Sequence, residues 1–120
     1  MVKIALPLLV VIIFVGCKGS VVRTQAEAQK NRKLILSLDI GMTEDQVLAT
    51  MGKPKKKEKY SRNDRTIEFW FYLTEGYMID DGKFRDSDYT PLGFEGGKLI
   101  GWGRSFYDRA LQYESEIETK

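Results

Sequence analysis

The side chains that most often carry chemistry are scarce in this chain of 120 residues, which has no histidine and a single cysteine, Cys17. The lack of histidine excludes the usual general base, the Ser–His and Cys–His nucleophile pairs and zinc sites that need histidine. Carboxylate pairs remain, but they need two acids held about 5–9.5 Å apart across a cleft. We therefore expect a protein that is not an enzyme; an enzymatic alternative would require a buried carboxyl group with a raised pKa.

Cys17 stands at the end of an apolar run that extends from Ile4 to Val15. This run is too short to span a bilayer comfortably, which takes about 20 apolar residues. The small Gly16 before the cysteine is typical of the cleavage site of a lipoprotein signal peptidase. We expect residues 1–16 to be a signal peptide and Cys17 to be the acylated first residue of the mature protein. The alternative is an uncleaved anchor helix in which the thiol is incidental.

Acyl chains on Cys17 would hold the protein on a membrane, because each buried CH₂ contributes about 0.8 kcal/mol. Lys18, rather than the Asp that retains proteobacterial lipoproteins at the inner membrane, follows the cysteine. The expected location is the outer membrane, facing the periplasm. This covalent lipid is the only cofactor that we expect, and a nucleic-acid partner is disfavoured in that compartment.

Two helices are predicted after a linker that ends at residue 23. The first begins near Thr24, which is spaced from Glu27 as in a capping box, and its apolar face lies near its end. The second is predicted over Glu44–Met51, with Thr43 as N-cap, Gln46 completing a capping box, and a glycine and a proline as the stop. The buried side chains expected in this second helix are Val47, Leu48 and Met51.

Residues 66–73 form the clearest strand, preceded by a turn at Asn63-Asp64. Alternation places four apolar residues on one face and Glu68, Trp70 and Tyr72 on the other. We expect the purely apolar face to pack on the helices. A second pair of strands, 91–95 and 98–102, is joined by a two-residue glycine turn. Its predicted register pairs Glu95 with Lys98 and Leu92 with Gly101.

These elements predict a small α+β domain in which two N-terminal helices pack on a three-stranded antiparallel sheet. The pattern Gly-Met-Thr-x-x-Gln-Val-Leu-x-x-Met-Gly-x-Pro at residues 41–54, followed by an aromatic strand and a Phe-x-x-Gly-x-Leu hairpin, resembles the SmpA/OmlA (BamE-like) small outer-membrane lipoproteins. The resemblance covers roughly residues 34–103. It implies the helix–helix–sheet fold also found in β-lactamase inhibitor proteins, and outer-membrane assembly proteins as partners.

Two groups of surface residues are candidates for partner contact. The first comprises large apolar side chains on the sheet face that the helices are expected to leave open: Trp70, Tyr72, Ile100 and Trp102. Exposed aromatic side chains often anchor interfaces; the alternative is that the first helix or the C-terminal segment covers them. The second group consists of Lys55, Lys56, Lys57 and Lys59. These lysines either protect a solvated edge strand or contact anionic lipid head groups or an acidic partner.

The long connection over residues 74–90 carries four aspartates, Asp80, Asp81, Asp86 and Asp88. Their spacing differs from that of an EF-hand loop, and aspartates in turns commonly bond to the backbone. We therefore expect no metal site there.

The chain divides into the signal peptide (1–16), a lipidated N-terminus and linker (17–23), an SmpA/OmlA-like domain (24–104) and a C-terminal extension (105–120). The expected function is a membrane-anchored, non-catalytic protein-interaction module in outer-membrane assembly or envelope integrity. The alternative is an envelope stress, ligand-binding or enzyme-inhibitor lipoprotein with the same fold.

Overall fold

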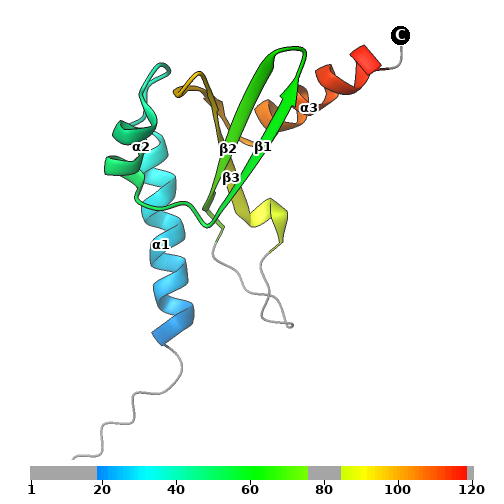
Figure 1. Ribbon diagram of the computed structural model, residues 1–120. Helices are drawn as coiled ribbons and strands as arrows, with labels where there is room; N and C mark the ends of the chain where they lie inside the picture. The colour runs from blue at the N-terminus through cyan, green and yellow to red at the C-terminus, as the bar shows by residue number, and fades with distance from the viewer. Residues whose placement is uncertain (1–18, 76–84, 119–120) are drawn as a thin grey trace, which may run out of the picture.

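The structure, a computed structural model, describes residues 19–75 and 85–118 and is an α+β fold (Figure 1). Cys17, Asp80 and Asp81 lie outside the described residues. The elements in chain order are α1 (Gly19–Ile35), α2 (Glu44–Met51), β1 (Lys56–Arg62), β2 (Arg65–Leu73), the short 3-10 helix η1 (Asp86–Asp88), β3 (Tyr89–Glu95), β4 (Lys98–Trp102) and α3 (Arg104–Glu118).

Helix α2 has the predicted bounds and the predicted caps. The Thr43 hydroxyl accepts a 3.2 Å hydrogen bond from the Gln46 backbone N–H, and the Gln46 side chain accepts a 3.0 Å bond from the Thr43 N–H. Gly52 ends the helix with φ of 77°, a conformation that costs other residues more than glycine. Val47 and Met51 are buried as expected, but Leu48 is 42% exposed, so its predicted burial is wrong.

Helix α1 is longer than predicted at its N-terminal end. It begins at Gly19, so residues 19–23, which we expected to be linker, are helical. One side of the helix is buried through Ala28, Asn31 and Ile35, at spacings of three and four residues. The Asn31 side chain donates a 2.9 Å hydrogen bond to the Leu73 carbonyl. This bond joins α1 to the end of β2.

The sheet has four antiparallel strands in the order β1-β2-β3-β4, rather than the three predicted. The additional strand, β1, is the lysine-rich segment, and it pairs with β2 along its whole length. Asn63 and Asp64 form the two-residue turn between them, with φ of 51° and 63°. Positive φ at both positions is the geometry that matches the twist of a two-residue hairpin. The prediction of a turn at these two residues is confirmed.

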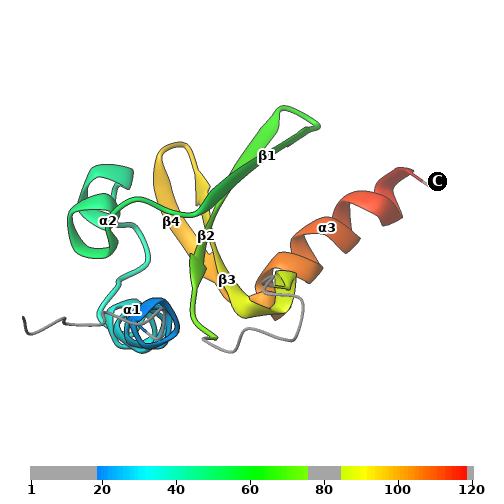
Figure 2. The same ribbon diagram turned by 90° about the horizontal axis from the view of Figure 1, so that it is seen from below.

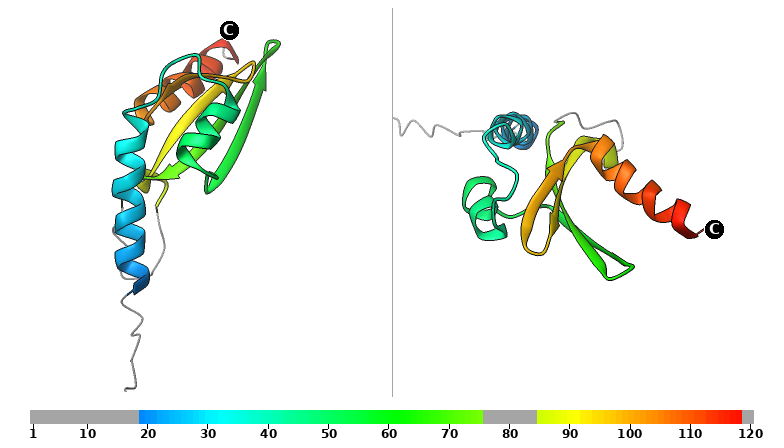
Figure 3. Two further views of the ribbon diagram at one scale, coloured as in Figure 1. Left: turned by 90° about the vertical axis from the view of Figure 1, so that its left-hand side faces the viewer. Right: turned by 90° about the horizontal axis from the view of Figure 1, so that it is seen from above.

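Both faces of the sheet are covered, which corrects the predicted orientation of β2. The three helices divide between the faces: α1 and α2 lie on one side and α3 on the other (Figures 2 and 3). Trp70 and Tyr72 point toward α1 and α2, in one cluster with Ile35, Val47 and Met51. The opposite face of β2 packs against side chains of α3; its buried residues are Ile67, Phe69 and Phe71. The face that was expected to be open is therefore the core beneath the first two helices.

A β-bulge between Gly93 and Phe94 changes the predicted register of the second hairpin. Glu95 pairs with Lys98 as predicted, but Leu92 pairs with Trp102 rather than with Gly101. One extra residue in one strand moves every later side chain of that strand to the opposite face of the sheet. Trp102 therefore packs against the cluster under α1 and α2, whereas Ile100 packs against the cluster under α3.

The outer edge of β4 is covered by the connection between α1 and α2. The Gly41 N–H donates to the Leu99 carbonyl and the Leu99 N–H donates to the Met42 carbonyl, each over 2.8 Å. Thr43 also forms a bridge with Lys98. The backbone of this edge is thereby paired within the chain, in the way that natural sheets protect an edge.

Candidate functional site

The aromatic residues predicted to bind a partner are mostly inside the protein. Trp70 and Tyr72 are each only 2% exposed, so the prediction of an exposed aromatic pair on β2 is wrong. Their polar atoms have partners: the Trp70 indole N–H donates a 2.6 Å bond to Glu68, and the Tyr72 hydroxyl donates a 2.8 Å bond to the Gly52 carbonyl. Burial raises the pKa of Tyr72 to about 12. Because the indole N–H and the tyrosine hydroxyl each have a hydrogen-bond partner, burial of the two rings leaves no unpaired donor inside the protein.

Ile100 and Trp102 are half-buried and lie on opposite sides of β4. The structure therefore does not bring the four aromatic and apolar candidates together on one surface. The large apolar side chains that are exposed among the described residues lie instead around the corner between α1 and α2: they are Leu36, Ile40 and Leu48, of which Leu36 is 83% exposed.

The four candidate lysines are exposed, and all of them lie on or beside β1. Lys55 pairs with Glu27 on α1 at 3.7 Å and Lys56 with Glu58 at 2.8 Å. Lys57 and Lys59 lie 4.0 and 3.9 Å from the single carboxylate of Glu68. Because the lysine side chains are more than half exposed, each of these ion pairs contributes little to the free energy of unfolding, about 0–1 kcal/mol.

The two faces of β1 differ in chemistry because side chains alternate along a strand. Lys57 and Lys59 lie on the Trp70 face, where the Lys57 ammonium is 4.5 Å from the centroid of the Trp70 ring. One carboxylate between two ammonium groups leaves this face with a net positive charge. The Lys56 ammonium, on the other face, lies 5.0 Å from the centroid of the Phe71 ring.

A hydrogen-bonded cluster that sequence reasoning missed ties β1 to α3. One carboxylate oxygen of Glu58 accepts from the hydroxyls of Tyr60 and Tyr107, each over 2.9 Å, and Lys56 approaches the other oxygen. Burial raises the pKa of the Glu58 carboxyl, but the hydrogen bonds from Lys56, Tyr60 and Tyr107 outweigh that effect and hold the pKa below its ordinary value. Burial, together with the bonds to Tyr60 and Glu58, raises the pKa of the Tyr107 hydroxyl.

The segment that we assigned to a C-terminal extension is thus part of the domain through α3. Phe106, Tyr107 and Ala110 pack against the cluster formed by Ile67, Phe69 and Phe71. Phe106 lies directly over Gly93 and Gly101, where a Cβ would come within 2.5 and 2.7 Å of its ring. Lys56, Glu58 and Tyr60 stand at every second position, so a strand over this segment would place their side chains on one face. Predicting such a strand would have brought these three residues of the cluster together.

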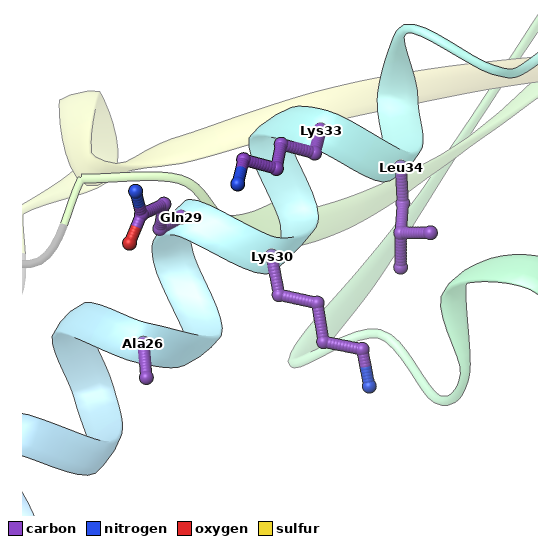
Figure 4. Close-up of a pocket in the computed structure, with 5 residues that line it drawn as sticks. All are labelled: Ala26, Gln29, Lys30, Lys33 and Leu34. Atoms are coloured by element: carbon purple, nitrogen blue, oxygen red, sulfur yellow. The ribbon is translucent and has the colours of Figure 1, made fainter.

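A surface hollow of about 350 Å³ lies along α1, lined by Ala26, Gln29, Lys30, Lys33 and Leu34 (Figure 4). These residues occupy successive turns of one helix. No described side chain from another element lines the hollow, so it is a depression along a single helix rather than a site where side chains from several elements converge.

Within the described ranges, 19–75 and 85–118, no group of three or more potential metal ligands comes together. Asp88 bonds to the backbone, since its carboxylate accepts a 2.6 Å bond from the Arg85 N–H. The same part of the chain contains no helix with the length and apolar character needed to cross a membrane.

The structure thus defines a small α+β domain whose four-stranded sheet is sandwiched between helices and carries a basic edge strand. A family model described as a protein of unknown function (DUF3192) matches residues 9–109, and the chain belongs to this family. No curated protein and no solved structure matches the chain.

Proposed function

We propose that this protein is a lipid-anchored, non-catalytic protein-interaction module of the bacterial outer membrane, acting in outer-membrane assembly or envelope integrity. The observation that carries the proposal is the apolar run that ends at Gly16-Cys17, two residues before α1 begins at Gly19. An acyl chain on Cys17 would join the membrane almost directly to α1. Residues 19–27 of this helix precede the buried residue Ala28 and span about 13 Å, so they would separate the sheet from the lipid surface.

The order of elements supports a relationship to the SmpA/OmlA lipoproteins. The resemblance at residues 41–54 coincides with α2 and its caps, and α1 and α2 cover one face of the strands β2, β3 and β4. We propose that this helix–helix–sheet unit corresponds to the scaffold of that family, and that β1 and α3 are additions to it. A scaffold of this type acts by presenting a surface to another protein, so envelope assembly proteins are the partners proposed.

The lipid anchor is tested by replacing Cys17 with serine in the full chain and separating soluble from membrane fractions of the native cells. We expect the C17S protein to leave the membrane. Membrane attachment that is unchanged by the substitution would contradict the anchor.

The outer-membrane location is tested by Lys18→Asp, which places an acidic residue after the proposed lipidated cysteine. We expect this variant to move to the inner membrane, whereas Lys53→Asp, the same charge change at an exposed position before β1, should leave the location unchanged. An unaltered distribution of the Lys18→Asp protein would contradict the proposed sorting.

The partner class is tested by crosslinking the intact tagged protein in its native membrane and identifying what is isolated with it. Recovery of components of the outer-membrane barrel-assembly machinery would support the assembly role. Recovery of an envelope enzyme or a stress-response protein alone would favour the alternative, an inhibitor or stress lipoprotein that uses the same fold.

A further inference from the structure

The two edges of the sheet differ in whether their backbone is paired. Gly41, Met42 and Thr43 cover the β4 edge, as described above. At the other edge, β1 pairs with β2 on one side only. In Figure 2 the turn end of the β1–β2 hairpin projects between α2 and α3, and no described element forms a strand on the outer side of β1.

The register identifies the backbone groups that this edge offers. In a two-residue hairpin the residues that flank the turn, Arg62 and Arg65, form a hydrogen-bonded pair, and such pairs alternate along the ladder. Tyr60 and Glu58 therefore direct their N–H and C=O groups toward β2. Lys57, Lys59 and Ser61 direct theirs outward, which presents three successive donor and acceptor pairs to an incoming strand.

The side chains at these positions define the charge of the strand that would fit. Lys57 and Lys59 point to the same face, their side chains are 54% and 65% exposed, and they share the single carboxylate of Glu68. A residue paired directly opposite each lysine would have its side chain on that face, where opposite charges attract and like charges repel. The edge therefore selects a segment with acidic side chains at alternate positions.

The same rule argues against a second copy of this chain as the occupant. An antiparallel pair of β1 strands centred on Lys59 would place Lys59 against itself and Lys56 against Arg62. A pair centred on Lys57 would place Lys57 against itself and Lys55 against Lys59. Like charges directly opposite one another destabilise such pairings.

We propose that the outer edge of β1 is a strand-addition site for an extended segment of another protein that has acidic residues at alternate positions. Backbone hydrogen bonds would supply affinity, and the two lysines would supply selectivity. This inference deepens the proposed function and rests on it only in that the protein acts by binding another protein. An anionic membrane is a weaker match, because lipid head groups cannot pair with an alternating row of N–H and C=O groups.

The test uses the full chain, purified from membranes in mild detergent, and a fluorescent synthetic peptide that alternates glutamate with valine. We expect saturable binding and new protection from hydrogen exchange at the amides of Lys57, Lys59 and Ser61. A matched peptide with lysine in place of glutamate should not bind. A peptide N-methylated on the amides that face β1 should lose most of its affinity, because its charges remain but its backbone donors do not.

A protein variant provides the reciprocal control. Lys59→Pro removes an outward N–H together with one of the two selecting lysines, at an edge position where proline is tolerated, and should weaken peptide binding by at least about threefold to tenfold. Lys98→Ala removes an exposed lysine from β4 and should leave binding unchanged. The N-methylated peptide keeps the test decisive if Lys59→Pro fails to fold.

Three results would overturn the strand-addition site. Equal binding of the acidic and N-methylated peptides would mean attraction of charges alone. Binding to vesicles with anionic lipid, with none to the peptide, would mean a membrane contact. Slow exchange of the three amides in the free protein would mean that the edge is already paired within the chain. None of these results depends on Cys17, so the strand-addition site and the lipid anchor can fail independently.

Discussion

Tyr107 on α3 donates a 2.9 Å hydrogen bond to the carboxylate of Glu58 on β1, across 49 positions of the sequence. This bond connects the last helix to the edge strand of the sheet. The Tyr107 ring also packs edge-on against Phe69, with 4.8 Å between the ring centroids. The residue thus joins the hydrophobic cluster under α3 to the charged surface of β1.

Replacing Tyr107 with phenylalanine keeps the ring and removes the hydroxyl. We expect a loss of about 1–2 kcal/mol in the free energy of unfolding, because a hydrogen bond to a charged acceptor disappears while Glu58 keeps Lys56 as a partner. Urea denaturation at pH 7 measures the loss. The control is Ser105→Ala, at an exposed position, which should change the free energy of unfolding by no more than about 0.5 kcal/mol. Phe106→Tyr would also leave the bond intact, but it is unsuitable because glycines lie close to the Phe106 ring. Full stability of the Tyr107→Phe protein would show that the bond contributes nothing.

The pKa of Glu58 predicts a pH dependence of stability. Burial opposes ionisation, but the bonds from Lys56, Tyr60 and Tyr107 hold the pKa of Glu58 in the folded protein below the ordinary glutamate value of 4.5. Because the carboxyl pKa is lower in the folded than in the unfolded protein, the ionised carboxylate stabilises the fold at pH values above the unfolded pKa. This stabilisation disappears as the pH falls through the folded pKa. The wild-type protein should therefore lose stability below about pH 4.5 more steeply than the Glu58→Gln protein. Parallel pH profiles of the two proteins in urea titrations would contradict this assignment.

Gly93 and Gly101 leave room for the Phe106 ring, which predicts coupling between these positions. A Cβ at Gly93 would lie 2.5 Å from the ring atom Cε1. We expect Gly93→Ala to lower the free energy of unfolding by about 1–3 kcal/mol through overpacking. In the double variant that combines Gly93→Ala with Phe106→Leu, the loss in the free energy of unfolding should be smaller than the sum of the losses in the two single variants. The reason is that leucine leaves space for the new Cβ. Strict additivity in urea denaturation would place Phe106 elsewhere.

The two tryptophans should respond differently to truncation. Trp70 is almost fully buried, and its ring lies 4.4 Å from that of Phe94 between centroids. Trp70→Ala should cost about 3–5 kcal/mol, as for other buried aromatic residues. Trp102 is half-buried, so Trp102→Ala should cost clearly less. Thermal or urea unfolding of the two variants measures the difference, and an equal or reversed order would contradict their placement in the core.

Local signals in the sequence predicted α2 and the first hairpin turn, but they did not predict β1 as a strand of the sheet or α3 as part of the domain. Helix α2 depends on Thr43, Gln46 and Gly52, and the first hairpin turn depends on Asn63 and Asp64; each acts within a few residues. Such features need no knowledge of the tertiary structure. The predicted α+β class follows from them and is confirmed.

The orientation of β2 could not be predicted from its own residues. We expected one covered face, and alternation then assigned the purely apolar side to the interior. Because α3 covers the second face, both sides of β2 are buried, and Trp70 and Tyr72 are accommodated by hydrogen bonds to Glu68 and to the Gly52 carbonyl. The bulge that moves Trp102 lies between Gly93 and Phe94, outside the glycine turn from which the register was predicted.

The candidate surface was found only in part. The lysines were identified, but their partners depend on the β1–β2 register in the case of Glu68 and on the packing of α1 beside the sheet in the case of Glu27. The availability of the β1 edge depends on the order of the strands, because a strand in the middle of the sheet would have no outward row of amides.

The measurement that tests the central claim most directly is the intact mass of the protein purified from its native membrane, followed by fragmentation of its N-terminal peptide. We predict a chain that begins at Cys17 and carries covalent acyl chains on that residue. A chain that retains residues 1–16, or one that begins at residue 17 with an unmodified thiol, would contradict the lipid anchor.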